Sequence, residues 1–62
     1  MKDNQLIIEY YEGDRECPLK VISIKPHPDY GERYYEVLYK RGKDEFTNVV
    51  CVQNDMVLVL PE

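Results

Sequence analysis

Five short runs rich in β-branched residues and tyrosine constrain the fold of this sequence more than any other feature. They span residues 6–11, 19–25, 33–40, 45–52 and 56–60, and all three glycines lie between them. β-Branched and aromatic side chains suit the pleated, half-buried surface of a strand, and regularly spaced short strands with turn residues between them indicate a sandwich or barrel. The sequence therefore predicts a small all-β domain of five strands, without a helix of useful length.

The length of the chain limits what it can do. Its 62 residues suffice for one domain, spanning 1–62, and we expect residues 1–5 and 61–62 to fray. A domain of ~60 residues buries only about 60% of the surface that its unfolded chain exposes, which leaves little material for the walls of a catalytic cleft. The prediction is a non-enzymatic binding protein without a cofactor.

Charge and hydropathy narrow the range of partners and compartments. The net charge is −4, and acidic and basic residues are mixed along the chain, which disfavours general attraction to phosphate backbones. No run approaches the ~18 apolar residues that a membrane span needs. The first five residues are polar and lack the hydrophobic stretch of a secretory signal. We therefore expect a cytoplasmic protein that does not bind membranes.

The residues that could carry reactive chemistry are few. Cys17 and Cys51 are expected to be reduced, although a bridge between them stays open, and Cys51 stands among valines, where a thiol acts as a small hydrophobic group. Neither cysteine forms a paired zinc motif with His27, so no metal site is predicted. Ser23 lies within an apolar run with no base signalled nearby. His27 lies between two prolines, and its imidazole is either presented to a ligand or solvated in an exposed loop.

The segment around Gly42 allows two hairpin registers. A loop at Arg41-Gly42 would place Lys40 opposite Lys43, and like charges are poor cross-strand partners. A type II′ loop at Gly42-Lys43 puts glycine at the first central position, which this turn requires. That register also places Arg41 opposite Asp44. We therefore predict a tight hairpin with its turn at Gly42-Lys43.

This register sorts the side chains of the hairpin between two faces, because alternate residues of a strand point to opposite sides. The face expected to form the core carries Tyr35, Val37, Tyr39, Phe46, Asn48 and Val50. The other carries Tyr34, Glu36, Leu38, Lys40, Glu45, Thr47, Val49 and Cys51, and is polar near the turn and apolar away from it. The apolar end is either a surface for a partner or a second buried region beneath a bent strand.

The lengths of the connections discriminate between small barrels. An OB-fold usually places a helix between its third and fourth strands, where this sequence has a tight turn, so that fold is disfavoured. An SH3-like barrel has a long first loop, a variable second loop, a tight hairpin, and a short turn before a short last strand. The sequence supplies these connections in that order, with residues 53–55 as the last turn. A five-stranded SH3-like barrel is the predicted architecture.

The second half of the chain supports the same architecture by resemblance. The stretch of residues 34–40, followed by Gly42, residues 44–46 and a later valine-rich strand, resembles the middle of a chromo-barrel or Tudor-type SH3-like domain. The resemblance implies an SH3-like fold and, in those families, an aromatic cage that binds methylated lysine or arginine by cation–π attraction. This chain departs from the families by lacking tryptophan, and no residue set here matches a whole cage.

Tyrosine supplies the main candidate binding surface. Neighbouring tyrosines in a strand point to opposite faces, so each pair is expected to give one core ring and one outward ring. Outward tyrosines offer a large contact area with few rotatable bonds, which suits a protein or peptide partner, or a second copy of the chain. The candidate partner-binding residues are Tyr11, Tyr30, Tyr34, Leu38 and Val49. The competing interpretation is that these rings complete the rim of the core.

A basic cluster supplies the alternative. Lys40, Arg41 and Lys43 lie at the predicted hairpin tip, where they could contact a nucleic-acid backbone. Asp44 and Glu45 oppose these charges in the preferred register. Nucleic-acid binding is therefore the second hypothesis, after a protein or peptide partner.

Overall fold

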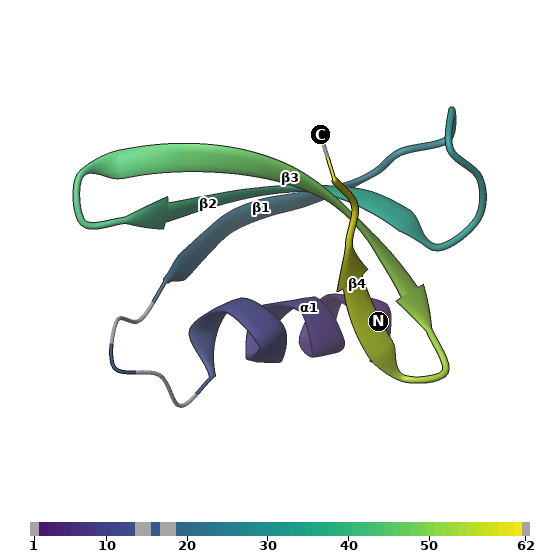
Figure 1. The fold of residues 1–62 in the computed structure, drawn as a ribbon, viewed down its shortest axis with the longest axis horizontal. Helices are drawn as coiled ribbons and strands as arrows, with labels where there is room; N and C mark the ends of the chain where they lie inside the picture. Colours follow the sequence, from purple (N-terminus) through teal and green to yellow (C-terminus); the bar gives the residue numbers. More distant parts are fainter. Residues whose placement is uncertain (1, 14–15, 17–18, 62) are drawn as a thin grey trace.

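The computed structural model describes residues 2–13, 16 and 19–61, and consists of one helix packed on one antiparallel sheet (Figure 1). The elements follow in the order α1 (Lys2–Glu12), β1 (Lys20–Pro26), β2 (Tyr34–Arg41), β3 (Asp44–Gln53) and β4 (Met56–Val59). The sheet order is β1-β2-β3-β4, so each strand pairs with its neighbour in sequence. Among the described residues, no helix is long and apolar enough to cross a membrane.

The structure is mostly β, as the sequence predicts, but the first of the five expected strands is wrong. Residues 6–11 lie inside α1, and the four strands found in the described part of the chain form one open sheet instead of a closed barrel. Ile7 and Tyr11 are buried, whereas Glu9 between them is exposed. A strand would put all three side chains on one face, whereas a helix brings together only residues about four apart. The expectation that no helix fits is therefore also wrong.

Residues at the two ends of α1 favour its formation and its termination. Asp3 in the first turn complements the positive end of the helix dipole. Gly13 follows the last turn, and a Cβ atom at this position would come within 2.5 Å of the Glu9 carbonyl oxygen. Glycine therefore lets the chain leave the helix by a path that other residues would block.

The hairpin register predicted for β2 and β3 is confirmed. Tyr39 pairs with Phe46, Lys40 with Glu45 and Arg41 with Asp44. Gly42 has φ of 60°, and Lys43 is not among the described residues with positive φ, as a type II′ turn requires.

The short turn before the last strand is present, but it is tighter than expected. Gln53 pairs with Met56, so the loop contains only Asn54 and Asp55, with φ of 49° and 60°. Two consecutive left-handed residues are typical of a type I′ hairpin turn, which asparagine and aspartate tolerate. β3 and β4 consequently form a second hairpin.

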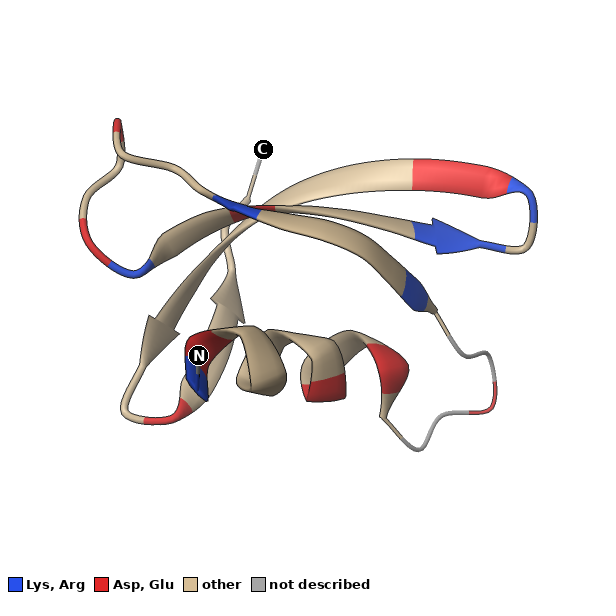
Figure 2. Ribbon diagram, turned by 180° about the vertical axis from the view of Figure 1, so that it is seen from behind, with Lys and Arg blue, Asp and Glu red and all other residues tan. Residues whose placement is uncertain are grey.

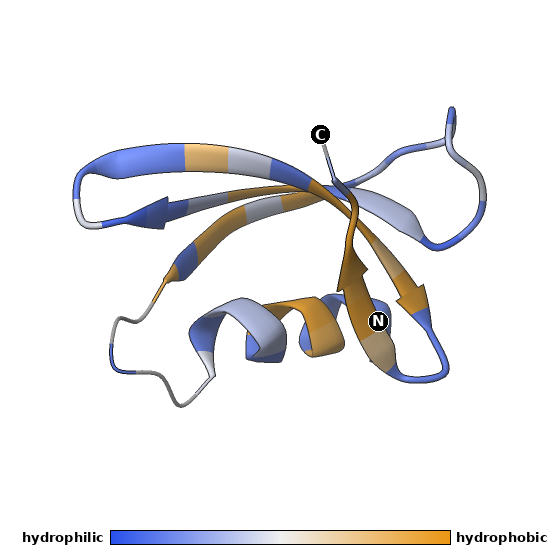
Figure 3. Cartoon of the chain, viewed as in Figure 1, coloured by the Kyte–Doolittle hydropathy of each residue, from blue (hydrophilic) through white to orange (hydrophobic). Residues whose placement is uncertain are grey.

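The core lies between α1 and the face of the sheet that carries the odd-numbered residues of β2. Val37, Val50 and Val52 are fully buried there beneath Ile7 and Tyr11. Figure 3 shows the apolar stretch of α1 lying opposite apolar segments of the strands. The predicted core face is therefore confirmed, except that Phe46, near the hairpin tip, keeps much of its ring exposed.

Polar contacts fix the helix to the sheet at both of its ends. Asp3 accepts hydrogen bonds from the Arg33 guanidinium at 2.8 and 3.1 Å and from the Tyr35 hydroxyl at 2.6 Å. At the other end, the Glu12 carboxylate accepts a bond of 2.8 Å from the Val21 N–H in β1. The first turn of α1 thus contains residues 2–5, which the sequence predicts to fray.

Candidate functional site

The loop between β1 and β2 positions the most exposed tyrosine of the described chain. His27 N–H donates to the Tyr34 carbonyl at 2.8 Å, and Tyr30 N–H donates to the His27 carbonyl at 3.1 Å. Pro28 occupies the first central position of this turn, where its fixed φ is favourable. Gly31 has φ of 119°, which glycine adopts readily. The loop is therefore an ordered support for the Tyr30 ring.

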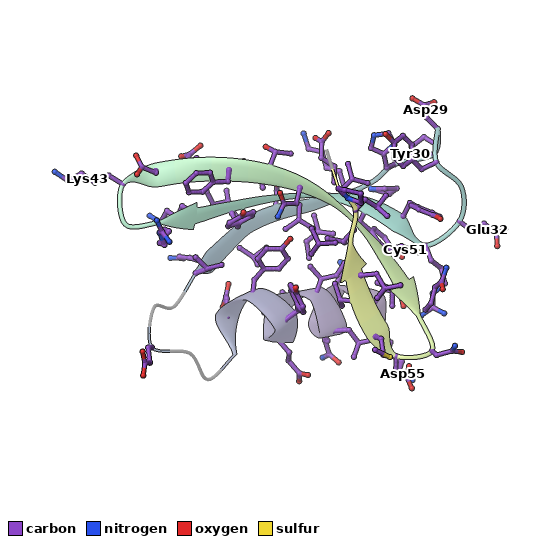
Figure 4. All side chains as sticks on the ribbon, in the orientation of Figure 1. Asp29, Tyr30, Glu32, Lys43, Cys51 and Asp55 are labelled. Atoms are coloured by element: carbon purple, nitrogen blue, oxygen red, sulfur yellow. The ribbon has the colours of Figure 1, made fainter. Side chains whose placement is uncertain are left out.

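The Tyr30 ring lies over the face of the sheet opposite α1. Its centroid is 4.4 Å from the His27 ring and 6.0 Å from the Tyr34 ring. Tyr30 also lines a pocket of about 210 Å³ together with Thr47, Val49, Leu60 and Pro61, among others. Although it contacts two rings, 56% of the Tyr30 surface stays exposed. Figure 4 shows Tyr30 above the sheet, at the opposite end of the molecule from Lys43.

Four of the five predicted partner-binding residues come together on this side. Tyr34 and Leu38 project from β2, and Leu38 pairs with Thr47, which shares the pocket with Tyr30 and Val49. We call Tyr30, Tyr34, Leu38 and Val49 the tyrosine face. Tyr34, Leu38 and Val49 are half-buried, so the Tyr30 ring is the one exposed side chain of the tyrosine face.

Tyr11 is not part of this surface, because it lies in α1 on the other side of the sheet. It is buried, its ring centroid is 4.7 Å from that of Tyr39, and its hydroxyl accepts a 3.2 Å bond from the Asn48 amide. The same amide donates to the Tyr39 hydroxyl at 3.2 Å. Tyr11 is thus a core ring, and its selection as an outward ring depended on the strand assignment that is wrong.

Cys51 lies beneath the tyrosine face as a buried free thiol. It pairs with Tyr34 across the β2–β3 ladder, and a hydrogen bond with this thiol raises the pKa of Tyr34 above its ordinary value near 10. The sequence left a bridge to Cys17 open, and Cys17 lies outside the described residues.

A second pocket adjoins the same loop, and Tyr34 is the one predicted partner-binding residue that lines it. It encloses about 510 Å³ and is lined by Ile24, Pro26, His27, Pro28, Tyr34 and Tyr35, with polar groups from Asn4 and from residues 31–33. The Nδ1 atom of His27 is buried without a hydrogen-bond partner. The sequence signal was the Pro-His-Pro triplet, which indicated a rigidly held imidazole but not its burial.

Arg33 lines the same pocket and has an unusual backbone conformation. Its φ is 62°, which non-glycine residues rarely adopt, and its carbonyl accepts a bond of 3.0 Å from the Val52 N–H. The hydrogen bond to Asp3 raises the pKa of Arg33 above its ordinary value. Contacts to α1 and to β3 together hold the strained backbone in place.

The basic residues of the alternative hypothesis meet at the hairpin tip. Lys40 and Arg41 end β2, and Lys43 lies in the turn. Glu45 pairs with Lys40 and Asp44 with Arg41, and Figure 2 shows acidic and basic segments side by side at this tip. The positive charge that the cluster offers to a phosphate backbone is thereby reduced.

No protein family, characterised protein or solved structure was found to match this chain.

Proposed function

We propose that the protein is a small non-enzymatic module that binds a protein or peptide partner through the tyrosine face. The observation that carries this proposal is the exposed Tyr30 ring, held on an ordered loop beside a pocket that contains Val49. An aromatic anchor next to a pocket is the usual arrangement of energetically important residues at an interface. The neighbouring half-buried side chains of Tyr34 and Leu38 extend the apolar contact area.

The chemistry of this surface favours an extended peptide with an apolar or proline-rich side. Tyrosine rings provide a large contact area and lose little conformational entropy on binding, and their hydroxyl groups can form hydrogen bonds at the rim of the interface. Glu36 and Lys25 form a cross-strand pair on the same side of the sheet and give the surface a polar border. The resemblance to chromo-barrel and Tudor-type domains, and with it the SH3-like barrel and methylated ligands, stays a prediction, and the proposal does not depend on it.

The alternative is a nucleic-acid-binding accessory protein that uses Lys40, Arg41 and Lys43. The clustering of these three cations at an exposed tip favours it, and the opposing Asp44 and Glu45 count against it. The two hypotheses use opposite ends of the molecule, so one set of variants separates them (Figure 4).

A displayed random peptide library, selected on the immobilised protein, tests the first hypothesis. We expect selected peptides to lose at least about tenfold in affinity when Tyr30 becomes serine, because truncating an aromatic anchor typically costs more than ~1.4 kcal/mol. Ile22→Ser, at an exposed apolar residue outside the tyrosine face, is the matched control and should leave affinity unchanged. Amide shifts on adding a selected peptide should map to residues 30, 34, 38 and 49.

Titration with duplex and single-stranded DNA oligonucleotides tests the alternative. Tight binding that weakens steeply with salt, and that disappears in the Arg41→Glu/Lys43→Glu variant, would overturn the peptide hypothesis. Selected peptides that shift only the protein amides at the hairpin tip would overturn it as well.

A further inference from the structure

We propose that β4 pairs antiparallel with β4 of a second copy of this chain, so that the two open sheets become one continuous sheet. β4 is an edge strand, because the sheet order places it beside β3 alone. An edge strand presents a row of unpaired N–H and C=O groups, which is a template for another strand. This inference concerns the edge of the sheet and does not rest on the proposed use of the tyrosine face.

β4 is short, at four residues, but it carries neither a charged residue nor a bulge, two of the features that usually protect such an edge. Residues 56–61 contain no charge, and Met56, Leu58 and Val59 are 61%, 44% and 40% exposed. Figure 3 shows the strand as an almost unbroken apolar segment, and Figure 2 shows no charged residue along it. Val59 lies on the side of the sheet that α1 covers, so its exposure shows that the helix leaves this part of the edge open.

The opposite edge of the same sheet is protected in several ways. β1 begins and ends with exposed residues, Lys20 and Pro26, and its register shifts between Val21 and Ser23, which marks a bulge. The Glu12 carboxylate also accepts the hydrogen bond of the Val21 N–H. Charge, proline, bulges and covering groups are the devices by which sheets avoid association at their edges. The contrast singles out β4 as the edge that is available for pairing.

The β3–β4 ladder identifies which backbone groups of β4 are free. Gln53 and Met56 flank the two-residue turn, and the Leu60 N–H donates to the Val49 carbonyl at 2.9 Å. Hydrogen-bonded pairs alternate along an antiparallel ladder, so residues 56, 58 and 60 direct their backbone groups toward β3. The N–H and C=O groups of Val57 and Val59 therefore point to the open edge.

These free groups fix the register of the pairing. Two residues that lie opposite each other must point to the same face of the joined sheet. Because alternate residues of a strand share a face, an even-numbered residue can lie only opposite an even-numbered one, and an odd-numbered residue only opposite an odd-numbered one. With Leu58 opposite Leu58 of the second copy, Val57 lies opposite Val59 and Met56 opposite Leu60. Both pairs of valines can then exchange two backbone hydrogen bonds. There are two neighbouring registers of this kind. The one centred on Val57 would oppose Val59 to Asp55, whose φ of 60° takes it out of the strand. The one centred on Val59 would oppose Val57 to Pro61, which has no N–H to donate.

A second copy fits this edge because the strand is self-complementary. Every side chain in the preferred register meets an apolar side chain, and no like charges are opposed within the strand. The two-fold axis runs perpendicular to the sheet at Leu58, so both helices lie on one side of the joined sheet and both tyrosine faces on the other. The contact involves one short strand from each copy, so we expect a weak dimer that forms with rising concentration.

Sedimentation of the full chain between about 1 μM and about 1 mM tests the proposal, with a rise from monomer to dimer mass as the expected result. Leu58→Lys should stay monomeric, because it places two positive charges together on the axis. Ile22→Lys makes the same change at an equally exposed residue, 45% against 44%, on the protected edge, and should dimerise like the wild type. Mixing Leu58→Lys with Leu58→Glu should restore the dimer as a heterodimer.

Amide exchange of the wild type provides a test that does not depend on any variant folding. The Val57 and Val59 amides should exchange more slowly at high concentration, whereas the Leu58 amide, bonded to β3, should change far less. A wild type that stays monomeric at the highest concentration would overturn the proposal. It would also be overturned by dimerisation that Ile22→Lys abolishes and Leu58→Lys does not.

Discussion

The backbone of Gly42 adopts a conformation that the type II′ turn demands and that no neighbouring atom enforces. Its φ is 60°, and a Cβ atom built there would meet nothing within 4 Å. The energetic cost of replacing Gly42 therefore comes from the backbone conformation and not from a clash with neighbouring atoms. We expect Gly42→Val to lower the free energy of unfolding by about 1–2 kcal/mol, as measured by chemical denaturation. Lys43→Ala, one position on, is the control, and a loss below ~0.3 kcal/mol for the glycine variant would contradict the assigned turn.

Asp3 links the stability of the fold to pH. Hydrogen bonds from Arg33 and then from Tyr35 lower its pKa below the ordinary value near 3.8. A lowered pKa in the folded state stabilises the fold above the ordinary pKa, and this contribution is lost as the pH falls through the lowered value. The same contact raises the pKa of Tyr35.

We therefore expect Asp3→Asn to be less stable than the wild type at neutral pH, with a difference that shrinks as the pH falls below 3.8. Urea denaturation at several pH values measures this difference. Asp55→Asn is the matched control, because the Lys2–Asp55 pair is largely exposed and asparagine tolerates the same left-handed backbone. An equal, pH-independent loss in both variants would contradict the role assigned to Asp3.

At the scale of single residues, the sequence predicted what local rules determine and missed what tertiary contacts determine. The glycine rule for tight turns and cross-strand charge pairing were sufficient to place Gly42 and its neighbours. No local rule predicts the left-handed Arg33, because its conformation depends on bonds to Asp3 in α1 and Val52 in β3. The unpartnered His27 nitrogen depends likewise on packing from both ends of its loop.

At the scale of elements, the segment of residues 6–11 shows how an apolar run can mislead. Short runs of this kind are ambiguous between strand and helix, and its tyrosines and isoleucines favoured a strand. Packing decided the outcome, because α1 covers a sheet face that would otherwise remain open. The spacing of four residues between Ile7 and Tyr11, with the polar Glu9 between them, is a periodic signal in favour of a helix.

Neighbouring isoleucines in α1 test this assignment. Ile7 is fully buried against the sheet, and Ile8 is exposed. We expect Ile7→Ala to lower the free energy of unfolding by ~3 kcal/mol, and Ile8→Ala to lower it by less than ~1 kcal/mol. Denaturant titrations of both variants measure the difference. Equal losses at the two positions would show that the helix packs differently or is not formed.

At the scale of the whole molecule, replacing the first strand by a helix changes what remains accessible. Five strands would close a barrel, whereas four leave two edges, of which β4 is unprotected. The register and both faces of the central hairpin were predictable from alternation and turn chemistry. Tyr30, Tyr34, Leu38 and Val49 lie on one side of the sheet, whereas Tyr11 lies in α1 on the other side. The larger pocket beside His27 could not be predicted, because its walls come from three separate segments.

The strictly sequential strand order bears on how quickly the chain folds. The β2–β3 and β3–β4 turns contain only two residues each, the β1–β2 connection spans residues 27–33, and each strand lies beside the one before it in sequence. Contacts between residues near in sequence need little loop-closure entropy, so the sheet can assemble fast for a β structure. The exception is the contact of α1 with the β3–β4 turn, where Lys2 meets Asp55 across nearly the whole chain. This contact closes the longest loop, so we expect it to form after the contact of α1 with β1, where Glu12 and Val21 are only nine residues apart.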